Sequence, residues 1–363
     1  MKAQLARFAG ISLLLLFLLG QTSCSSIGPA TVPRDRADYS AALSESWKRQ
    51  TLLNIVRLRY LDPPTFIEVA NIISGYQFQF AGSFGGQLSS ANAVQGNTLN
   101  MGSAATYIDR PTITYTPLTG NKFVKGLMTP LPPEQVFFTI QSGWPADGVL
   151  FTTVAEINGL KNQENSIAGV TPPDARFMRV LELMRKIQLS GAVGMRVLQE
   201  TQKQQSVLLT FRSKDIPDAT LQDVRELRTL LRLDPEAPDF KLVFGGTSSN
   251  EREVAVRTRS IIQQMSTMAS QVDVPEDHLR RNYAAPGWES VRDQPGAVRL
   301  IQIHSSKSKP AQAFVMVEYR GHWFWIDDGD LKSKRVFSFM MLLFTLADTG
   351  EKENLPLVTI PAQ

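Results

Sequence analysis

Residues 69–108 read VANIISGYQFQFAGSFGGQLSSANAVQGNTLNMGSAATYI, and these 40 residues contain no Asp, Glu, Lys, Arg or His. A stretch of this length in a protein of ordinary composition holds about ten charged residues. The segment is not simply apolar, because Gly, Ser, Asn, Gln and Thr are interspersed with its aromatic residues. It is the most unusual segment of the chain, and it decides the fold that we expect near the N-terminus.

Apolar and polar residues alternate in both halves of this segment. Because successive side chains of a strand point to opposite faces, the alternation predicts a β-hairpin with one apolar face. Pairing Leu88 with Leu99 places Tyr107 opposite Phe80 and brings the apolar residues of both strands together, with a turn over residues 89–98. The predicted apolar face consists of Tyr76, Phe78, Phe80, Phe84, Leu88, Leu99, Met101 and Tyr107.

The N-terminus has the layout of a secretory signal. Lys2 and Arg7 precede the apolar run FAGISLLLLFLL at residues 8–19, and the small and polar residues GQTSCSS follow it at 20–26. A basic start, a short apolar core and small residues before a break are typical of an export signal. The run of about 12 residues is shorter than the roughly 20 that a membrane-spanning helix needs.

Residues 21–24, QTSC, resemble the lipobox of bacterial lipoproteins, with Thr22 and Ser23 at the small positions and Cys24 at the acylated one. Gln21 stands where that family usually has a leucine-like residue. The resemblance covers residues 1–26 and implies cleavage before Cys24 and lipid attachment to it. Because Ser25 rather than Asp follows, it also implies the outer membrane. Cys24 is the only cysteine, so no disulfide forms within the chain.

The uncharged hairpin suits a membrane, and it suits other surroundings as well. Each half has the 9–11 residues of a spanning strand, but one hairpin leaves backbone groups unpaired in lipid, so several copies would have to close one barrel. The layout resembles the lipoprotein channel that exports curli subunits, in which each subunit donates β-hairpins to one barrel. The alternatives are packing on the protein's own helices or on a partner, and a flexible Gly- and Ser-rich loop.

Helical and strand patterns alternate through the rest of the chain and predict an α+β fold of mixed helices and antiparallel strands. Arg320 and Gly321 form a plausible two-residue turn between strands, and Trp323 and Trp325 share a strand face that we expect to lie under the C-terminal helix. Helices are expected over 38–61, 174–189, 218–231, 260–271 and 333–347, and strands over 195–200, 206–212, 241–244, 253–257, 298–304, 313–319, 322–326 and 355–360.

We divide the chain into four parts on these patterns. Residues 1–23 are the expected signal peptide, and residues 24–37 are small, polar and Pro-containing, as expected of a lipidated tether. Residues 38–190 form a helical region that carries the hairpin 66–116, and residues 191–363 form a C-terminal α+β region.

No catalytic, metal or cofactor site is predicted. His278, His304 and His322 have no partners at metal-ligand spacing, and the common nucleophile, phosphate-loop and dinucleotide motifs are absent from the sequence. The best polar cluster is acidic and comprises Asp327, Asp328 and Asp330. It suits a cation or a carboxylate pair, but we favour a turn into a helix start, where acids suit the helix dipole, because the calcium-loop pattern is missing.

Charge and motifs together favour an interaction role. The formal net charge is +4, of which Lys2 and Arg7 supply two, so the processed chain carries +4 − 2 = +2, which is too little to indicate a nucleic-acid partner. We expect a non-enzymatic, lipid-anchored outer-membrane protein with its body in the periplasm, no cofactor, and protein partners or copies of itself as partners. The alternatives are an oligomeric export pore built from the hairpin 66–116, and an envelope hydrolase or glycan-binding protein centred on 327–330.

Overall fold

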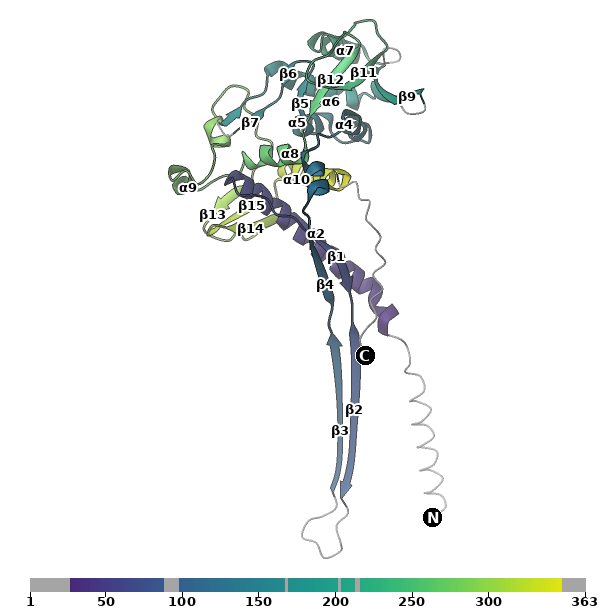
Figure 1. Ribbon diagram of the computed structural model, residues 1–363, viewed down its shortest axis with the longest axis vertical. Helices are drawn as coiled ribbons and strands as arrows, with labels where there is room; N and C mark the ends of the chain where they lie inside the picture. Colours follow the sequence, from purple (N-terminus) through teal and green to yellow (C-terminus); the bar gives the residue numbers. More distant parts are fainter. Residues whose placement is uncertain (1–26, 88–97, 167–168, 202–203, 213–215, 348–363) are drawn as a thin grey trace, which may run out of the picture. The chain divides into compact units, whose positions relative to one another are not determined.

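The structure is a computed structural model that describes residues 27–87, 98–166, 169–201, 204–212 and 216–347. The chain forms two compact units. The first, which we call the ribbon unit, comprises the residues up to Glu45 and Ile67–Pro117. The second, which we call the body, comprises Ser46–Phe66 and the residues from Leu118 onward. The expected α+β class is confirmed, because helices accompany several mainly antiparallel sheets (Figure 1).

This division differs from the boundary that we expected at residue 190. Strand β5 (Val154–Ile157) lies before that residue and strand β12 (Glu253–Thr258) lies after it, yet the two pair in one sheet, with Val256 opposite Ile157. A sheet that takes strands from both sides of residue 190 forms one unit with one core, so residue 190 is not a boundary between two structural regions.

Helix α2 (Ile27–Arg59) begins eleven residues earlier than the expected start at Asp38. Residues 27–37, which belong to the segment 24–37 that we expected to be a tether, are therefore helical. Pro29 falls in the first turn, where the missing N–H of a proline leaves no helical bond unmade, and the Arg and Ala residues that follow favour helix. Pro33 lies inside the helix. Cys24 and the expected signal peptide lie outside the described residues.

The ribbon unit holds two pairs of antiparallel strands. Strand β1 (Ile67–Ile73) pairs with β4 (Thr112–Pro117), and β2 (Tyr76–Gln87) pairs with β3 (Thr98–Asp109) along 12 residues each. Figure 1 shows β2 and β3 side by side over their whole length. We call the pair β2–β3 the ribbon. Leu88 and the residues of the expected turn as far as 97 lie outside the described residues.

The register of the ribbon differs from the predicted one by two residues. Tyr107 lies opposite Phe78 rather than Phe80, and Leu99 lies opposite Gly86 rather than Leu88. A slip of two residues leaves every residue of a strand on its original face. The apolar pattern is therefore the same in both registers, and it did not distinguish between them.

The body is built around a six-stranded sheet with the strand order β6-β5-β12-β11-β10-β9. Only β11 and β12 run parallel to each other; the other neighbours are antiparallel. A separate three-stranded sheet has the order β13-β15-β14. The strands not yet given are β6 (Leu160–Lys161), β7 (Glu164–Ser166), β8 (Gly169–Thr171), β9 (Val193–Thr201), β10 (Gln204–Phe211), β11 (Asp239–Phe244), β13 (His304–Ser306), β14 (Val315–Tyr319) and β15 (His322–Ile326).

Three helices of the body lie within a few residues of the ranges expected from the sequence, 174–189, 218–231 and 260–271. Asp174 caps α6, and Ser260 caps α8 with a capping box. Among the described residues, no helix has the length and apolar character needed to cross a membrane. The helices are α3 (Asn121–Met128), α4 (Pro133–Gln141), α5 (Ala146–Thr153), α6 (Ala175–Leu189), α7 (Asp218–Leu230), α8 (Ile261–Ala269), α9 (Glu276–Arg280), η1 (Trp288–Ser290) and α10 (Leu331–Ala347).

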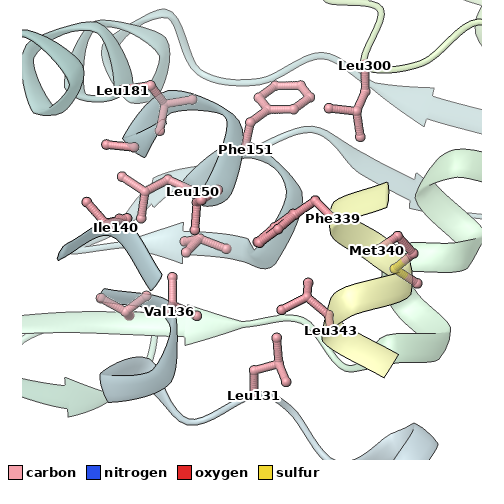
Figure 2. Close-up of a cluster of buried hydrophobic side chains, with 14 of the residues drawn as sticks. Leu131, Val136, Ile140, Leu150, Phe151, Leu181, Leu300, Phe339, Met340 and Leu343 are labelled. Carbon is pink, nitrogen blue, oxygen red and sulfur yellow. The ribbon is translucent and has the colours of Figure 1, made fainter. Parts of the chain in front are cut away.

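One apolar core joins the helices to the sheet. Figure 2 shows side chains of α4, α5, α6 and α10 meeting in it, among them Val136, Leu150 and Leu343. Met340 of α10 is fully buried and Leu343 nearly so. Burial of such side chains contributes about 1.5–3 kcal/mol each to the free energy of unfolding.

Two expectations about the C-terminal part were wrong. Residues 298–303 are not a strand, because the N–H groups of Leu300 and Ile301 donate to the Gln271 side chain at 2.6 and 3.3 Å instead of to a neighbouring strand. Trp323 and Trp325 are only half-buried; the buried face of β15 carries His322, Phe324 and Ile326. The strand expected over 355–360 lies outside the described residues.

Candidate functional site

The ribbon is exposed along its length. Apart from the half-buried Tyr76 and Ile108, every side chain described in β2 and β3 is exposed, including Phe78 at 53% and Tyr107 at 50%. Half-exposed aromatic rings on opposite strands present apolar surface to whatever surrounds the ribbon. By backbone position, Phe80, Phe84, Leu99 and Met101 also lie in β2 and β3, as the sequence analysis expected.

Both outer edges of the ribbon are open within the described residues. Strands β2 and β3 form a sheet of two strands, and neither pairs with any other strand in the described part of the chain. Protein edge strands are usually blunted by Lys, Pro, bulges or short length. The ribbon has none of these: it is 12 residues long, its pairing is regular, and its only charged residue is Asp109 at one end.

The base of the ribbon is held by helix α2. The hydroxyl of Tyr76 donates to the carboxylate of Asp35, which also pairs with Arg34 at 3.1 Å. The hydrogen bond from Tyr76 holds the pKa of Asp35 below its usual value. The Tyr76 ring stacks on Tyr107 with centroids 6.2 Å apart, and a hydrogen bond with Tyr107 raises the pKa of Arg34. These contacts fix one end of an otherwise unsupported ribbon.

Sequence reasoning missed Arg34 and Asp35. They lie in the segment 24–37, which we expected to be a tether, and their charges looked like those of any solvated linker. The contact that gives them a role joins residues more than 40 positions apart. No spacing within the segment signals such a contact.

The side chains of the acidic cluster are held by hydrogen bonds and an ion pair within a turn. Asp327 accepts the N–H of Gly329 at 2.7 Å, and Asp328 pairs with Lys334 at 2.7 Å. Asp330 accepts the N–H and the hydroxyl of Ser333 at 3.0 and 2.5 Å. This is the geometry of a turn leading into the start of α10. The described residues contain no group of three or more His, Cys, Asp and Glu side chains that could hold a metal ion.

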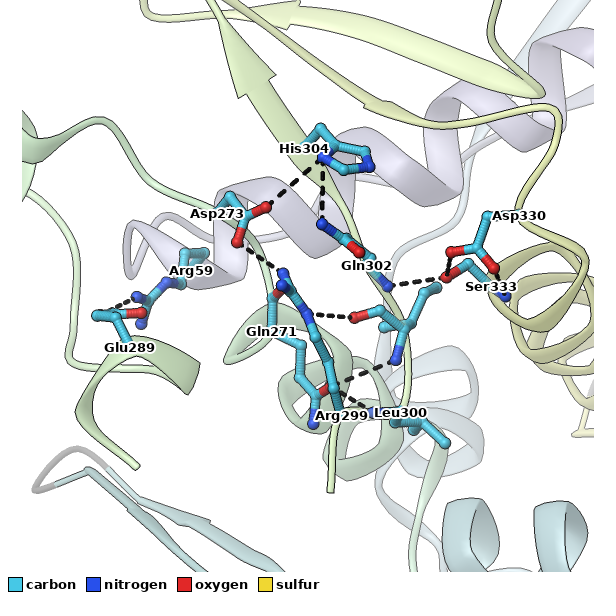
Figure 3. A network of polar contacts seen from close by, with 11 residues as sticks. Arg59, Gln271, Asp273, Glu289, Arg299, Leu300, Gln302, His304, Asp330 and Ser333 are labelled. Carbon is cyan, nitrogen blue, oxygen red and sulfur yellow. Dashed lines mark hydrogen bonds and ion pairs between the residues drawn. The ribbon is translucent and has the colours of Figure 1, made fainter. Parts of the chain in front are cut away.

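A second polar network, drawn in Figure 3, surrounds residues 298–302. The Arg299 guanidinium pairs with Asp273 at 2.6 Å, and His304 lies 3.7 Å from the same carboxylate. The N–H of Gln302 donates to the Ser333 hydroxyl at 2.9 Å. Because these contacts satisfy the backbone of a segment that lacks strand neighbours, the network fixes residues 298–302 beside α10.

Arg259 is a buried cation whose nearest partners are carbonyl groups. Its guanidinium donates to the carbonyls of Phe151 and Thr152 at 2.9 and 3.3 Å, and to that of Gln163. Two of these carbonyls end helix α5, where the helix dipole favours a positive charge. Burial lowers the pKa of Arg259 to about 10, so the side chain stays charged at neutral pH. This arrangement anchors α5 to the sheet rather than forming a reaction centre.

The ribbon differs from the acids and the buried cations, which are engaged internally, because its aromatic rings are half-exposed and its outer edges are unpaired within the described residues. No protein-family model, no curated protein and no solved structure matches this chain.

Proposed function

We propose that this chain is a non-enzymatic, lipid-anchored protein of the bacterial outer membrane whose ribbon joins copies of the chain into an assembly. The observation that carries the proposal is the pair of open edges on a ribbon of 12-residue strands that lacks the usual protective charges. An isolated two-stranded sheet is marginal in water. Pairing with further strands satisfies its backbone groups and covers its aromatic side chains.

A second copy suits these edges because its strands offer the same uncharged, regular backbone. If β2 of one copy pairs with β3 of the next, the contact is head-to-tail, and repeated contacts close a ring or extend a filament. If β2 pairs with β2, the contact is two-fold and by itself joins only two copies, with the β3 edges left open. The two arrangements differ in which strands of neighbouring copies touch.

Cysteine cross-linking between copies tests the assembly. With the Cys24 thiol acylated, an introduced cysteine is the only free thiol of the chain. Copies carrying Gln79→Cys or Gln77→Cys in β2 are co-expressed with copies carrying Thr106→Cys or Ala104→Cys in β3. Mixed β2–β3 cross-links indicate a ring or filament, and β2–β2 cross-links indicate the two-fold contact. The wild type and Arg225→Cys, an exposed site on α7 of the body, are the controls.

Two results together would contradict assembly through the ribbon. A detergent-extracted wild-type protein with the mass of one chain, together with no cross-link above the Arg225→Cys background, rules out assembly through the ribbon. A lipid-anchored monomer would then remain.

The lipid anchor has an independent test. We expect cells expressing the wild type to incorporate a palmitate analogue into the protein, and the Cys24→Ser variant to lose that label and its retention on membranes. More than one acyl chain gives stable anchoring, whereas a single chain gives only marginal binding. Unchanged labelling of Cys24→Ser would contradict the proposal without affecting the assembly test.

A second candidate function is a pore in which the assembled ribbons cross the membrane. It is favoured by strands of 12 residues, because 9–11 residues suffice to span, and by the uncharged stretch 69–108. In a pore, single cysteines at Gln77 and Gln79 react with a water-soluble reagent, while one at Phe78 reacts only with a lipid-phase probe. Absence of lipid-phase labelling at every ribbon position would end the pore hypothesis and leave assembly in water.

A further inference from the structure

The body contains a cavity of about 440 Å³ bounded by helices α5, α6 and α10 and by residues 298–300. Its floor is apolar. Figure 2 shows Phe151, Leu181, Leu300 and Phe339, which line the cavity and are 3–4% exposed. Trp144 adds a ring whose centroid lies 4.9 Å from that of Phe339. The volume lies within the range of about 300–1,000 Å³ found for small-molecule sites.

The rim of the same cavity is cationic. Five basic residues and two acidic residues line it, which gives an excess of 5 − 2 = 3 positive charges, against a net charge of +4 for all 363 residues. Positive charge is therefore concentrated at this cavity. The basic residues are Arg185, Lys186, Arg299, Lys332 and Arg335, and the acidic ones are Asp147 and Glu182.

Three of the five cations are engaged within the body. Lys186 pairs with Glu182 at 3.0 Å, Arg299 pairs with Asp273 at 2.6 Å, and Lys332 donates to the Arg299 carbonyl at 2.6 Å. The other two, Arg185 and Arg335, have donors to spare.

Arg185 and Arg335 lie on different helices beside the cavity. The Arg185 guanidinium donates one N–H to the Gln188 side chain at 2.7 Å. Its Nε lies 4.0 Å from the Asp147 carboxylate, which is a weak contact. Arg335 is exposed on α10 and makes no hydrogen bond or ion pair within the described part of the chain. A guanidinium presents five donors in a planar fork that matches a carboxylate. Two such forks beside one apolar floor define a site for a ligand with a negative head and an apolar chain.

We propose that this cavity binds a single-chain lipid anion of the fatty-acid type, with the acyl chain on the floor and the carboxylate at Arg185 and Arg335. A small polar anion would leave uncovered the partly exposed apolar side chains of the lining, Trp144, Met178 and Val298. An uncharged hydrocarbon would place apolar surface beside the cationic rim. A fatty acid matches both the apolar floor and the cationic rim. This site does not depend on assembly through the ribbon.

Photo-cross-linking on the full chain in its membrane tests this site. The probe is a long-chain fatty acid with a diazirine in its chain, and mass spectrometry locates the labelled residues. We expect label on peptides that contain Phe151, Leu181 or Phe339. Competition by unlabelled fatty acids from eight to fourteen carbons should strengthen about fourfold per added methylene until the cavity is full.

Charge variants separate this site from general partitioning into the membrane. Arg185→Glu and Arg335→Glu should each weaken labelling about tenfold, because each removes a charge-assisted contact to the carboxylate. Arg225→Glu, an exposed Arg on α7 outside the cavity, should leave labelling unchanged. Dodecanol should compete at least tenfold less well than dodecanoate.

Three results would overturn the inference. Label spread over exposed peptides would mean that the cavity is not the site. Equal competition by dodecanol and dodecanoate would mean that the cationic rim does not recognise the carboxylate. Equal loss of label in Arg225→Glu and Arg335→Glu would mean that overall charge attracts the probe.

Discussion

The guanidinium of Arg59 lies 2.6 Å from the carboxylate of Glu289, and the Arg59 side chain is 1% exposed whereas that of Glu289 is 36% exposed. The cation also donates to the Ala285 carbonyl, while its Nε is buried without a hydrogen-bond partner among the described residues. Figure 3 shows the pair joining the end of α2 to the segment around η1. A buried charge with one anionic partner makes this contact sensitive to substitution.

We expect Glu289→Gln to lower the free energy of unfolding by about 3 kcal/mol, because it leaves the Arg59 charge buried without an anion. The measurement is chemical denaturation of the full chain. Glu251→Gln is the matched control, since Glu251 is exposed and its substitution should change stability by less than about 0.5 kcal/mol. Equal losses in the two variants would show that the ion pair contributes nothing specific.

Gly287 is packed too closely to accept a side chain. A Cβ there would overlap the Ser270 carbonyl oxygen and the Arg59 guanidinium, and the Gly287 N–H donates to Glu289 at 2.9 Å. We expect Gly287→Ala to destabilise the body by about 1–3 kcal/mol through overpacking. Gly148→Ala on α5, where a Cβ meets nothing within 4 Å, should be neutral or stabilising. A melting temperature that falls equally in both variants would contradict the close-packing argument.

Leu343 and Leu342 are adjacent on α10 but differ in burial, at 3% and 39% exposed. Leu343→Ala should cost about 2–5 kcal/mol, because it opens a cavity in the core. Leu342→Ala makes the same chemical change on the same helix and should cost well under half as much. The two urea midpoints give the comparison directly, and similar midpoints would mean that the orientation of α10 is wrong.

His278 makes the stability of the body depend on pH. It is 7% exposed, its Nδ1 lies 2.8 Å from the Tyr60 hydroxyl, and burial lowers its pKa. Since protonation is easier in the unfolded chain, the stabilisation is present above the unfolded pKa of about 6.5 and is lost as pH falls through the lower folded pKa.

We therefore expect the urea midpoint to fall between pH 8 and pH 5, and to fall less in His278→Phe. Asp62 does not interfere in this window. A hydrogen bond from Tyr319 lowers the pKa of Asp62 below its ordinary 3.8, so its contribution is lost only at more acidic pH. Parallel pH profiles for the wild type and His278→Phe would rule out His278 as the source.

The helices were predictable because their signals are local. Apolar spacing repeats within a few turns, so the patterns over 174–189 and 260–271 predicted α6 and α8 without reference to the rest of the chain. The positive φ angles of Arg320 and Gly321 likewise match the two-residue turn that the dipeptide predicted.

The failures have a common physical cause, which is that a local pattern fitted two structures equally well. The run from His322 to Ile326 is apolar on both strand faces, so alternation could not decide which face is buried. The apolar run around Leu300 looked like a strand, but the Gln271 side chain, about 30 residues away, satisfies its backbone. The cavity was missed for a different reason, because its lining residues are distant in the sequence and only tertiary packing places them around one pocket.

The pairing of Ile157 with Val256 has a consequence for the timing of synthesis. About 100 residues must be made after β5 before that strand gains its partner β12, and α10, which completes the core, comes later still. Until then the part of α4 that packs against β11 and β12 stays uncovered, and such surfaces attract chaperones, proteases and other unfinished chains. A longer delay therefore exposes more newly made chains to these competitors before the core closes.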